Sequence, residues 1–333
     1  MRLPPVLAAV PLLALAATGA AAQSSLQIGG LIDIGLYRDT SKTWQLGPIQ
    51  RSNLAFSGTE DLGGGLAATF ALNMRFETDT GQLEQVGKPF FHGESTVGLK
   101  GGLGSIRLGR ALDAMESQDW KFDAWGNYDR IASPAWDIWH YNYPTDPRGN
   151  ANGTPEYGRL NNGVFYDSPS FNGLAVHLST AATEDVRGLP AGTAGIANSP
   201  VQPWGVSLNY DGKAWAAMLA HERNSNGDTD TFAGLRGTLG DFSVYGAWDR
   251  SEALASGSLA KVLTLSAQYV MGRITLRGGW GRLDLDGAQA QRTLSAGVAY
   301  AFSKRTSVYV DAASKRYPTD TRSMYGVGMA HSF

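Results

Sequence analysis

The sequence alternates apolar and polar side chains in segments about ten residues long, and this pattern constrains the fold most. From Leu66 to Glu77, apolar side chains occupy the even positions, and small or polar side chains occupy the odd positions. Similar alternation recurs in residues 27–37, 174–179, 263–269 and 294–302. A period of two between turn residues predicts β-strands with two different faces. A transmembrane barrel and a soluble sandwich both show this pattern, so other features must separate them.

The N-terminus indicates export. Residues 1–22 have the pattern of a secretory signal peptide: Arg2, an apolar core from Val6 to Ala17, and small residues up to Ala22. Cleavage after Ala22 would leave residues 23–333 as the mature chain. A retained N-terminal anchor is the alternative, but the apolar run is short for a membrane span.

Composition narrows the function classes. The chain has no cysteine, which excludes disulfides, metal–thiolate sites and cysteine nucleophiles, and its five histidines are scattered. We therefore expect no cofactor and no metal site. The 28 basic and 30 acidic side chains nearly balance, which argues against a nucleic-acid partner.

The connections between the alternating segments come in two sizes. No apolar stretch beyond the signal approaches the roughly 20 residues of a helical span, which leaves a closed barrel as the option for an exported membrane protein. Short Gly- and Asn-rich turns alternate with long polar connections, as expected for turns at one rim and loops at the other. The short turns are 61–65, 102–104, 171–173, 211–213, 271–272 and 303–304. The long connections are 39–47, 78–89, 112–158, 185–202, 224–229, 251–259, 285–290 and 315–321. We predict one all-β domain, a transmembrane antiparallel β-barrel of sixteen strands.

Several segments resemble the non-enteric branch of the Gram-negative general porin family. They are residues 51–66 (RSNLAFSGTEDLGGGL), 97–110, 166–174 and the final strand through His331, Ser332 and Phe333. The resemblance implies a homotrimer in the bacterial outer membrane, in contact with its lipid and lipopolysaccharide. It implies passive diffusion of ions and small hydrophilic solutes. It also implies that Phe333, on the outward face of the last strand, is a signal for the barrel assembly machinery. The chain departs from the family in residues 112–158 and at Ala330, where a basic residue is usual.

Residues 112–158 match in position the third loop, which folds into porin lumens as a constriction. They carry eight acidic and three basic side chains. The resemblance and the alternation place Arg51 and Arg75 on the opposite, basic wall, with Arg107 and Lys100 as further candidates. The candidate acids of the loop are Asp113, Glu116, Asp119 and Asp123. Opposed charges across a narrow channel would create a transverse field that filters solutes. Solvated acids and locally paired arginines are the alternative.

The same loop is rich in aromatic side chains. They are Trp120, Phe122, Trp125, Tyr128, Trp136, Trp139, Tyr141 and Tyr143. Such rings either stack on a solute, which would make a porin selective for a sugar or an aromatic or organic-acid solute, or anchor the loop. We favour anchoring, because a long folded loop needs an apolar cluster of its own.

Two other classes of protein remain as alternatives. An outer-membrane hydrolase would need a histidine paired with a nucleophile, but no Gly-x-Ser-x-Gly motif occurs and no histidine lies in a nucleophile motif. We therefore expect no enzymatic activity. A soluble secreted β-sandwich or lectin is the second alternative, and extraction from membranes would distinguish it.

Overall fold

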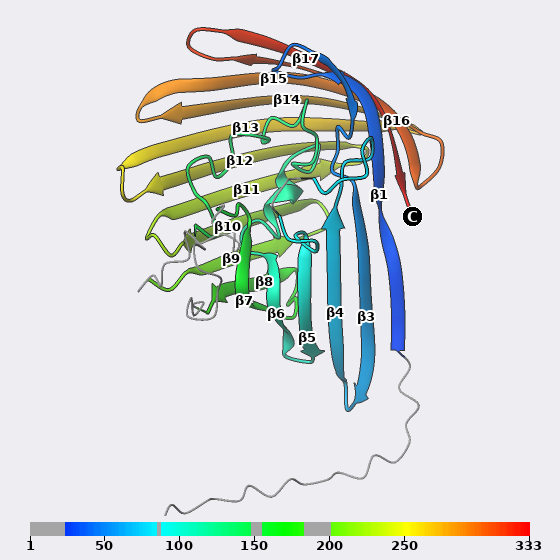
Figure 1. The fold of residues 1–333 in the computed structure, drawn as a ribbon, viewed down its shortest axis with the longest axis vertical. Coiled ribbons are helices and arrows are strands. Elements are labelled where there is room, and N and C mark those ends of the chain that lie inside the picture. Colours follow the sequence, from blue (N-terminus) through cyan, green and yellow to red (C-terminus); the bar gives the residue numbers. More distant parts are fainter. Residues whose placement is uncertain (1–23, 85–87, 148–154, 183–200) are drawn as a thin grey trace, which may run out of the picture.

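A single antiparallel sheet forms the protein, and it curves into a closed barrel (Figure 1). The computed structural model describes residues 24–84, 88–147, 155–182 and 201–333. The predicted signal peptide therefore lies outside the described residues. The first strands are β1 (Ser24–Arg38), β2 (Trp44–Gly47), β3 (Asn53–Gly63), β4 (Leu66–Arg75), β5 (Glu94–Gly101), β6 (Gly104–Leu112), β7 (Arg159–Asp167) and β8 (Leu174–Ala181). They are followed by β9 (Trp204–Asp211), β10 (Trp215–Arg223), β11 (Thr229–Leu239), β12 (Phe242–Ala253), β13 (Ser258–Met271), β14 (Ile274–Leu285), β15 (Ala288–Ala301), β16 (Thr306–Arg316) and β17 (Thr321–Ser332).

The barrel closes between its first and last strands. From β3 on, each strand pairs with the next along the chain, and β1 pairs with β17 in a register that sets Leu31 opposite Ser332. β2 pairs with the end of β1, and β3 pairs with its beginning. Together β2 and β3 therefore form one interrupted barrel strand. The predicted sixteen-stranded barrel is thus confirmed.

Within the described residues, the connections follow the predicted alternation of short and long, with three differences. The predicted connection 39–47 contains the strand β2, and most of the predicted connection 185–202 lies outside the described residues. The prediction of a long connection over residues 285–290 is wrong, because only Asp286 and Gly287 separate β14 from β15. Both have a positive φ, 52° and 85°, which matches the tight type I′ turn that an Asp-Gly pair favours. The sequence analysis also missed the short turn at Gly240 and Asp241, between β11 and β12.

The two faces of the strands differ as expected for a barrel in lipid. On β15, the outward side chains Leu294 and Val298 are 65% and 49% exposed, whereas Thr293 and Ser295 on the inner face are buried. The last strand likewise turns Tyr325, Val327 and Met329 outward. Within the described residues, no helix is both long and apolar enough to cross a membrane.

The loop between β6 and β7 packs against the inside of the barrel wall. In Figure 1 this segment, coloured cyan to green, lies across the space that the strands enclose. It contains the one-turn 3-10 helix η1 (Asp119–Phe122), which contacts β11 and β12. Phe122 and Trp139 pack on Phe232 of the wall. A second cluster joins Trp125 and Ile131 of the loop to inward residues of other strands, among them Tyr309. The apolar core therefore lies between the loop and the wall.

Candidate pore constriction

An interruption in one barrel strand positions Arg51. Between β2 and β3, residues 48–52 leave the ladder opposite Asp33 of β1. The buried Asp33 carboxylate replaces the missing partner: its Oδ1 accepts hydrogen bonds from the backbone N–H groups of Ile49 at 2.7 Å and Gln50 at 2.8 Å. The Tyr309 hydroxyl donates to the other oxygen at 2.5 Å. These bonds fix the backbone, so Arg51 projects inward from a rigid segment.

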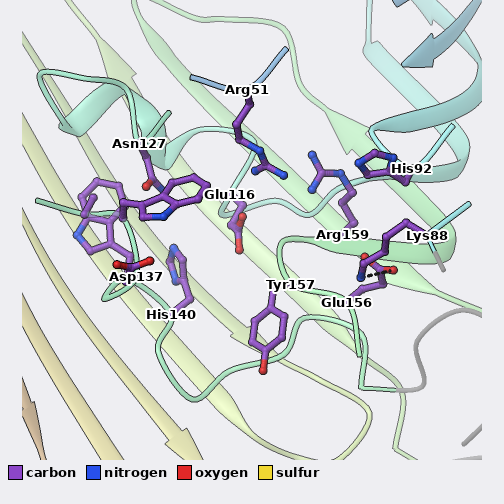
Figure 2. A pocket seen from close by; sticks show the side chains of 13 residues that line it. Arg51, Lys88, His92, Glu116, Asn127, Asp137, His140, Glu156, Tyr157 and Arg159 are labelled. Carbon is purple, nitrogen blue, oxygen red and sulfur yellow. Dashed lines mark hydrogen bonds and ion pairs between the residues drawn. The ribbon is translucent and has the colours of Figure 1, made fainter. Parts of the chain in front are cut away.

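Two adjoining cavities lie between the loop and this part of the wall. The larger has a volume of about 310 Å³ and the smaller about 60 Å³. They share four lining residues, which are Arg51, Glu116, Asn127 and Arg159. Figure 2 shows the larger cavity, with the guanidinium groups of Arg51 and Arg159 directed toward one another and Glu116 beside them.

Three arginines form the basic side of these cavities. Arg51 comes from the strand interruption, Arg75 ends β4, and Arg159 begins β7. Arg51 makes a two-pronged ion pair with Glu84, with both N–O distances at 2.7 Å. Among the described residues, Arg75 and Arg159 make no ion pair with a carboxylate. The Arg75 guanidinium lies 5.9 Å from the Tyr128 ring, and the Arg159 Nε donates to the Gly93 carbonyl at 2.9 Å. Two of the three positive charges are therefore left uncompensated.

Glu84 ties the arginine wall to the loop. It accepts hydrogen bonds from Arg51 and, at 3.0 Å, from Arg130 of the loop, and it lies 3.4 Å from His92. Burial alone would raise the pKa of the Glu84 carboxyl, but the hydrogen bonds from His92 and Arg51 and the charges of Arg51 and Arg75 outweigh it and hold that pKa far below its ordinary range. Glu84 is therefore ionised and cancels one positive charge of the wall.

Glu116 is the acidic side chain that borders both cavities. Burial is the main cause that raises the pKa of its carboxyl to about 8. The nearby His140 and Arg159 act to lower that pKa, and the neighbouring Asp113 and Asp119 act to raise it. At neutral pH the Glu116 carboxyl is therefore mostly protonated and contributes little negative charge.

The other acids predicted for the constriction have different positions. Asp119 lines the smaller cavity, but its carboxylate bonds to His140 at 2.9 Å. Asp113 is buried and caps the N–H groups of Met115 and Glu116 at 2.9 and 2.7 Å. Asp123 is also buried, where it accepts a hydrogen bond from the Ser266 hydroxyl of the wall at 3.2 Å. The structure thus brings neither Asp113 nor Asp123 to a described cavity.

The remaining predicted basic residues lie nearer the short-turn end of the barrel. Arg107 pairs with Glu94 at 2.8 Å and Asp167 at 3.3 Å. Lys100 pairs with Ser105 in the ladder between β5 and β6, close to the short turn that joins these strands. Neither lines the two cavities. Sequence reasoning missed Arg159, although its place at the start of the strand after the long loop is a usable signal.

The loop aromatics fall into two groups. Phe122, Trp125, Trp139 and Tyr143 are buried, and the indole N–H of Trp125 donates to Asp311 of the wall at 2.9 Å. These rings anchor the loop, as favoured above. Trp120, Tyr128 and Trp136 border the cavities, and the buried Trp139 also lines the larger one. Arg51 lies over the Trp136 ring, 5.6 Å from its centroid.

A closed antiparallel barrel with an apolar outer face and a charged, hollow interior defines an outer-membrane channel. The model of the Gram-negative porin family matches residues 8–320, and the chain belongs to that family. It is a porin of the bacterial outer membrane, a passive channel for ions and small solutes.

Relatives and solved structures agree with this assignment. The chain is 26% identical to outer membrane porin protein 32 of Delftia acidovorans, over 90% of this chain and 86% of the relative. It is 25% identical to an outer membrane porin protein of Bordetella pertussis, over 98% of this chain and 99% of the relative. The anion-selective porin from Comamonas acidovorans has a similar fold, with a TM-score of 0.77 at 22% identity, over 93% of this chain and all of that one.

Proposed function

We propose that this porin prefers anions, and that its constriction lies where Arg51, Arg75 and Arg159 face Glu116 of the loop over residues 112–158. The observation that carries the proposal is the uncompensated charge at the two cavities. Arg75 and Arg159 have no carboxylate partner among the described residues, and the facing Glu116 carboxyl has a pKa of about 8. Positive charge on the wall of a narrow passage concentrates anions and repels cations.

The remaining acids near the constriction are occupied by other cations. Glu156 pairs with Lys88 and Arg110, each at 2.9 Å. Asp137 pairs with the buried Lys315 of β16. These acids hold the loop in place and add little free negative charge to the passage. The porin from Comamonas acidovorans is named as anion-selective, which agrees with the preference for anions proposed here.

Reversal potential in a planar bilayer tests the proposal. Purified protein reconstituted between unequal KCl solutions should give stepwise, ohmic conductance and a reversal potential of the sign set by chloride. A potential of the sign set by potassium would contradict anion preference while leaving the porin assignment intact. Arg273→Gln, which removes an arginine from the exposed turn between β13 and β14, is the matched control and should not change the potential.

A solute-selective porin is the second candidate, and Trp136 favours it. This ring borders the larger cavity beside Arg51, so an aromatic carboxylate could pair with the guanidinium and stack on the indole. Benzoate should then block chloride current at lower concentration than acetate, and Trp136→Ala should remove the difference. Equal block by both anions would leave only general anion diffusion. A sugar has no charge to engage the arginines.

We infer no enzymatic activity. The serine, histidine and aspartate that come together at β6–β8 lack the order of a catalytic triad, because Ser105 donates to Asp167 rather than to His177. A hydrolysis assay with lipid and peptide substrates should give no activity above that of buffer.

We also propose a homotrimer, assembled by the barrel assembly machinery through Phe333. A trimer form of Vibrio cholerae OmpT, which shares the fold, supports this arrangement. The Phe333 ring lies at the outer face, and its backbone pairs with Gly30 of β1. Light scattering in detergent should give three times the monomer mass. Phe333→Ala should reduce the amount of folded protein in the outer membrane, and unchanged amounts would remove Phe333 from assembly.

Lipopolysaccharide is the lipid partner we propose, at a row of outward arginines near the long-loop rim. Arg282, Arg292 and Arg316 lie directly opposite one another across β14, β15 and β16. Arg282 is paired with Asp284 at 2.9 Å, but Arg292 and Arg316 repel one another, and anionic phosphate groups would relieve that repulsion. Arg292→Gln should reduce the lipopolysaccharide that copurifies with the protein. Equal amounts would contradict the site.

A further inference from the structure

His140 of the loop lies against two aspartates of the barrel wall. Asp230 is on β11 and Asp249 on β12, and both carboxylates are completely buried. The His140 backbone has a φ of 54°, in the left-handed region that non-glycine residues rarely adopt. Such backbone strain persists where the surroundings fix it, often at functional sites. Here it holds the imidazole against the wall.

The distances resemble those within a metal coordination shell. His140 Nδ1 lies 2.7 Å from Asp230 Oδ2 and 2.9 Å from Asp249 Oδ2. One nitrogen or oxygen from each of the three residues lies within 4.8 Å of the others. Ligand atoms about 2.1 Å from one central cation would lie roughly 3–3.5 Å apart, so a small movement would admit an ion.

Polar atoms around this point lack partners. Oδ1 of Asp230 and Oδ1 of Asp249 are buried and have no hydrogen bond among the described residues. The hydroxyl of Ser251 is also buried and unpaired, and Ser251 lies directly opposite Asp230 in the ladder. Buried polar atoms without partners are costly. The two unpaired carboxylate oxygens belong to the residues that contact the imidazole, and a bound cation would compensate their charge.

We propose that His140 Nδ1, Asp230 and Asp249 bind a divalent transition-metal cation of the zinc class. One imidazole nitrogen with two carboxylates is a ligand set that suits Zn²⁺ and its first-row neighbours better than Ca²⁺ or Mg²⁺. Asp119 completes the arrangement, because it lies 2.9 Å from His140 Nε2. A metal-bound histidine characteristically donates its other N–H to a carboxylate, which fixes the ring and its tautomer.

One of the three ligand residues, His140, lines the larger cavity, and Asp230 and Asp249 are buried. An ion from the aqueous passage would therefore reach the two carboxylates past the His140 side chain. The bound cation would neutralise the two wall carboxylates and join the loop to β11 and β12. This would hold the pore-lining part of the loop at a fixed distance from the arginine wall. The inference is independent of the preference for anions, since it concerns the anchoring of the loop.

The metal-free alternative is a doubly protonated His140 that serves as the cation between Asp119, Asp230 and Asp249. It leaves three carboxylates around one positive charge, with the two wall Oδ1 atoms still unpaired. The two arrangements differ by one proton on the His140 imidazole, and this difference can be measured. Binding of a metal to Nδ1 displaces its proton, so metal uptake at neutral pH should release protons to the buffer.

Zn²⁺ titration of the chelator-treated full-length porin in detergent tests the proposal. Isothermal titration calorimetry should give one site per chain, with a heat that depends on the buffer's ionisation enthalpy. Asp249→Asn should weaken binding at least 100-fold, and Asp119→Asn about tenfold or more. The matched control Asp241→Asn, in an exposed β11–β12 turn, should bind as the wild type does. No saturable binding by the wild type, or equal binding by Asp249→Asn, would overturn the site.

Co²⁺ provides a second measurement that needs no variant, in case loss of Asp249 prevents folding. Visible absorption should appear, saturate at one equivalent per chain and disappear when Zn²⁺ is added. Absence of the visible bands at saturating Co²⁺ would overturn the proposal even if every variant failed to fold.

Discussion

Replacement of Arg75 by glutamine removes one of the uncompensated positive charges of the proposed constriction. The smaller cavity, of about 60 Å³, has a radius near 2.4 Å, so an ion inside it lies about 5 Å from the guanidinium. At that distance the interaction in water is about 0.8 kcal/mol. A Debye length of about 10 Å at 0.1 M salt reduces it to about 0.5 kcal/mol.

Loss of this energy lowers the anion concentration in the constriction and raises the cation concentration by the same factor. The anion-to-cation permeability ratio should therefore fall about fivefold. In a tenfold KCl gradient, where perfect selectivity gives about 59 mV, this corresponds to a shift of roughly 20–30 mV toward the potassium limit. Single-channel recording in planar bilayers measures the shift. A shift below about 5 mV, with folding intact, would place Arg75 outside the constriction.

Three further predictions concern the charge of the loop and the packing that supports the pore. The Glu116 carboxyl, whose pKa is raised to about 8, ionises as the pH rises from 7 to 9, so anion preference should decline over that range. Glu116→Gln should abolish this decline in reversal-potential measurements, and a persisting decline would assign it to another group. Asp33→Ala should lower the thermal unfolding midpoint, because it leaves the buried N–H of Ile49 unpaired, at a cost of about 1–3 kcal/mol, and also that of the partly buried Gln50. An unchanged midpoint would contradict the role given to Asp33. Gly234→Ala should loosen the loop, since the added Cβ would lie 2.4 Å from the Phe122 ring. Increased current noise with normal barrel assembly would verify this prediction, whereas wild-type noise would contradict it.

The barrel was predictable from the sequence because it depends on local patterns. Two-residue alternation fixes which side chains face lipid, and it correctly turned Arg75 inward from β4. The residue types in the turns could also have been used to predict the length of each connection. The pair Asp286 and Gly287 is typical of a tight hairpin, and its misassignment as part of a long connection came from reading polar residues as loop.

The proposed constriction was less predictable because it depends on contacts between distant segments. Asp113 was expected to face the channel, yet it caps the start of its own loop, as aspartate commonly does in turns. The partners of His140 lie 90 and 109 residues further along the chain. No spacing rule connects them, so the cluster becomes visible only after the loop is folded against the wall.

The interruption between β2 and β3 places Arg51, a residue of the proposed constriction, outside the strand ladder. Arg51 projects from a segment whose backbone is held by the Asp33 side chain rather than by the strand ladder. The type of residue at position 51 therefore has little influence on the closure of the barrel. During divergence of the family, a substitution at this position would leave the strand register unchanged, although it would also remove the partner of Glu84. If Arg51 lines the constriction as proposed, substitutions at this site would let a lineage adjust which solutes it admits while the barrel still assembles.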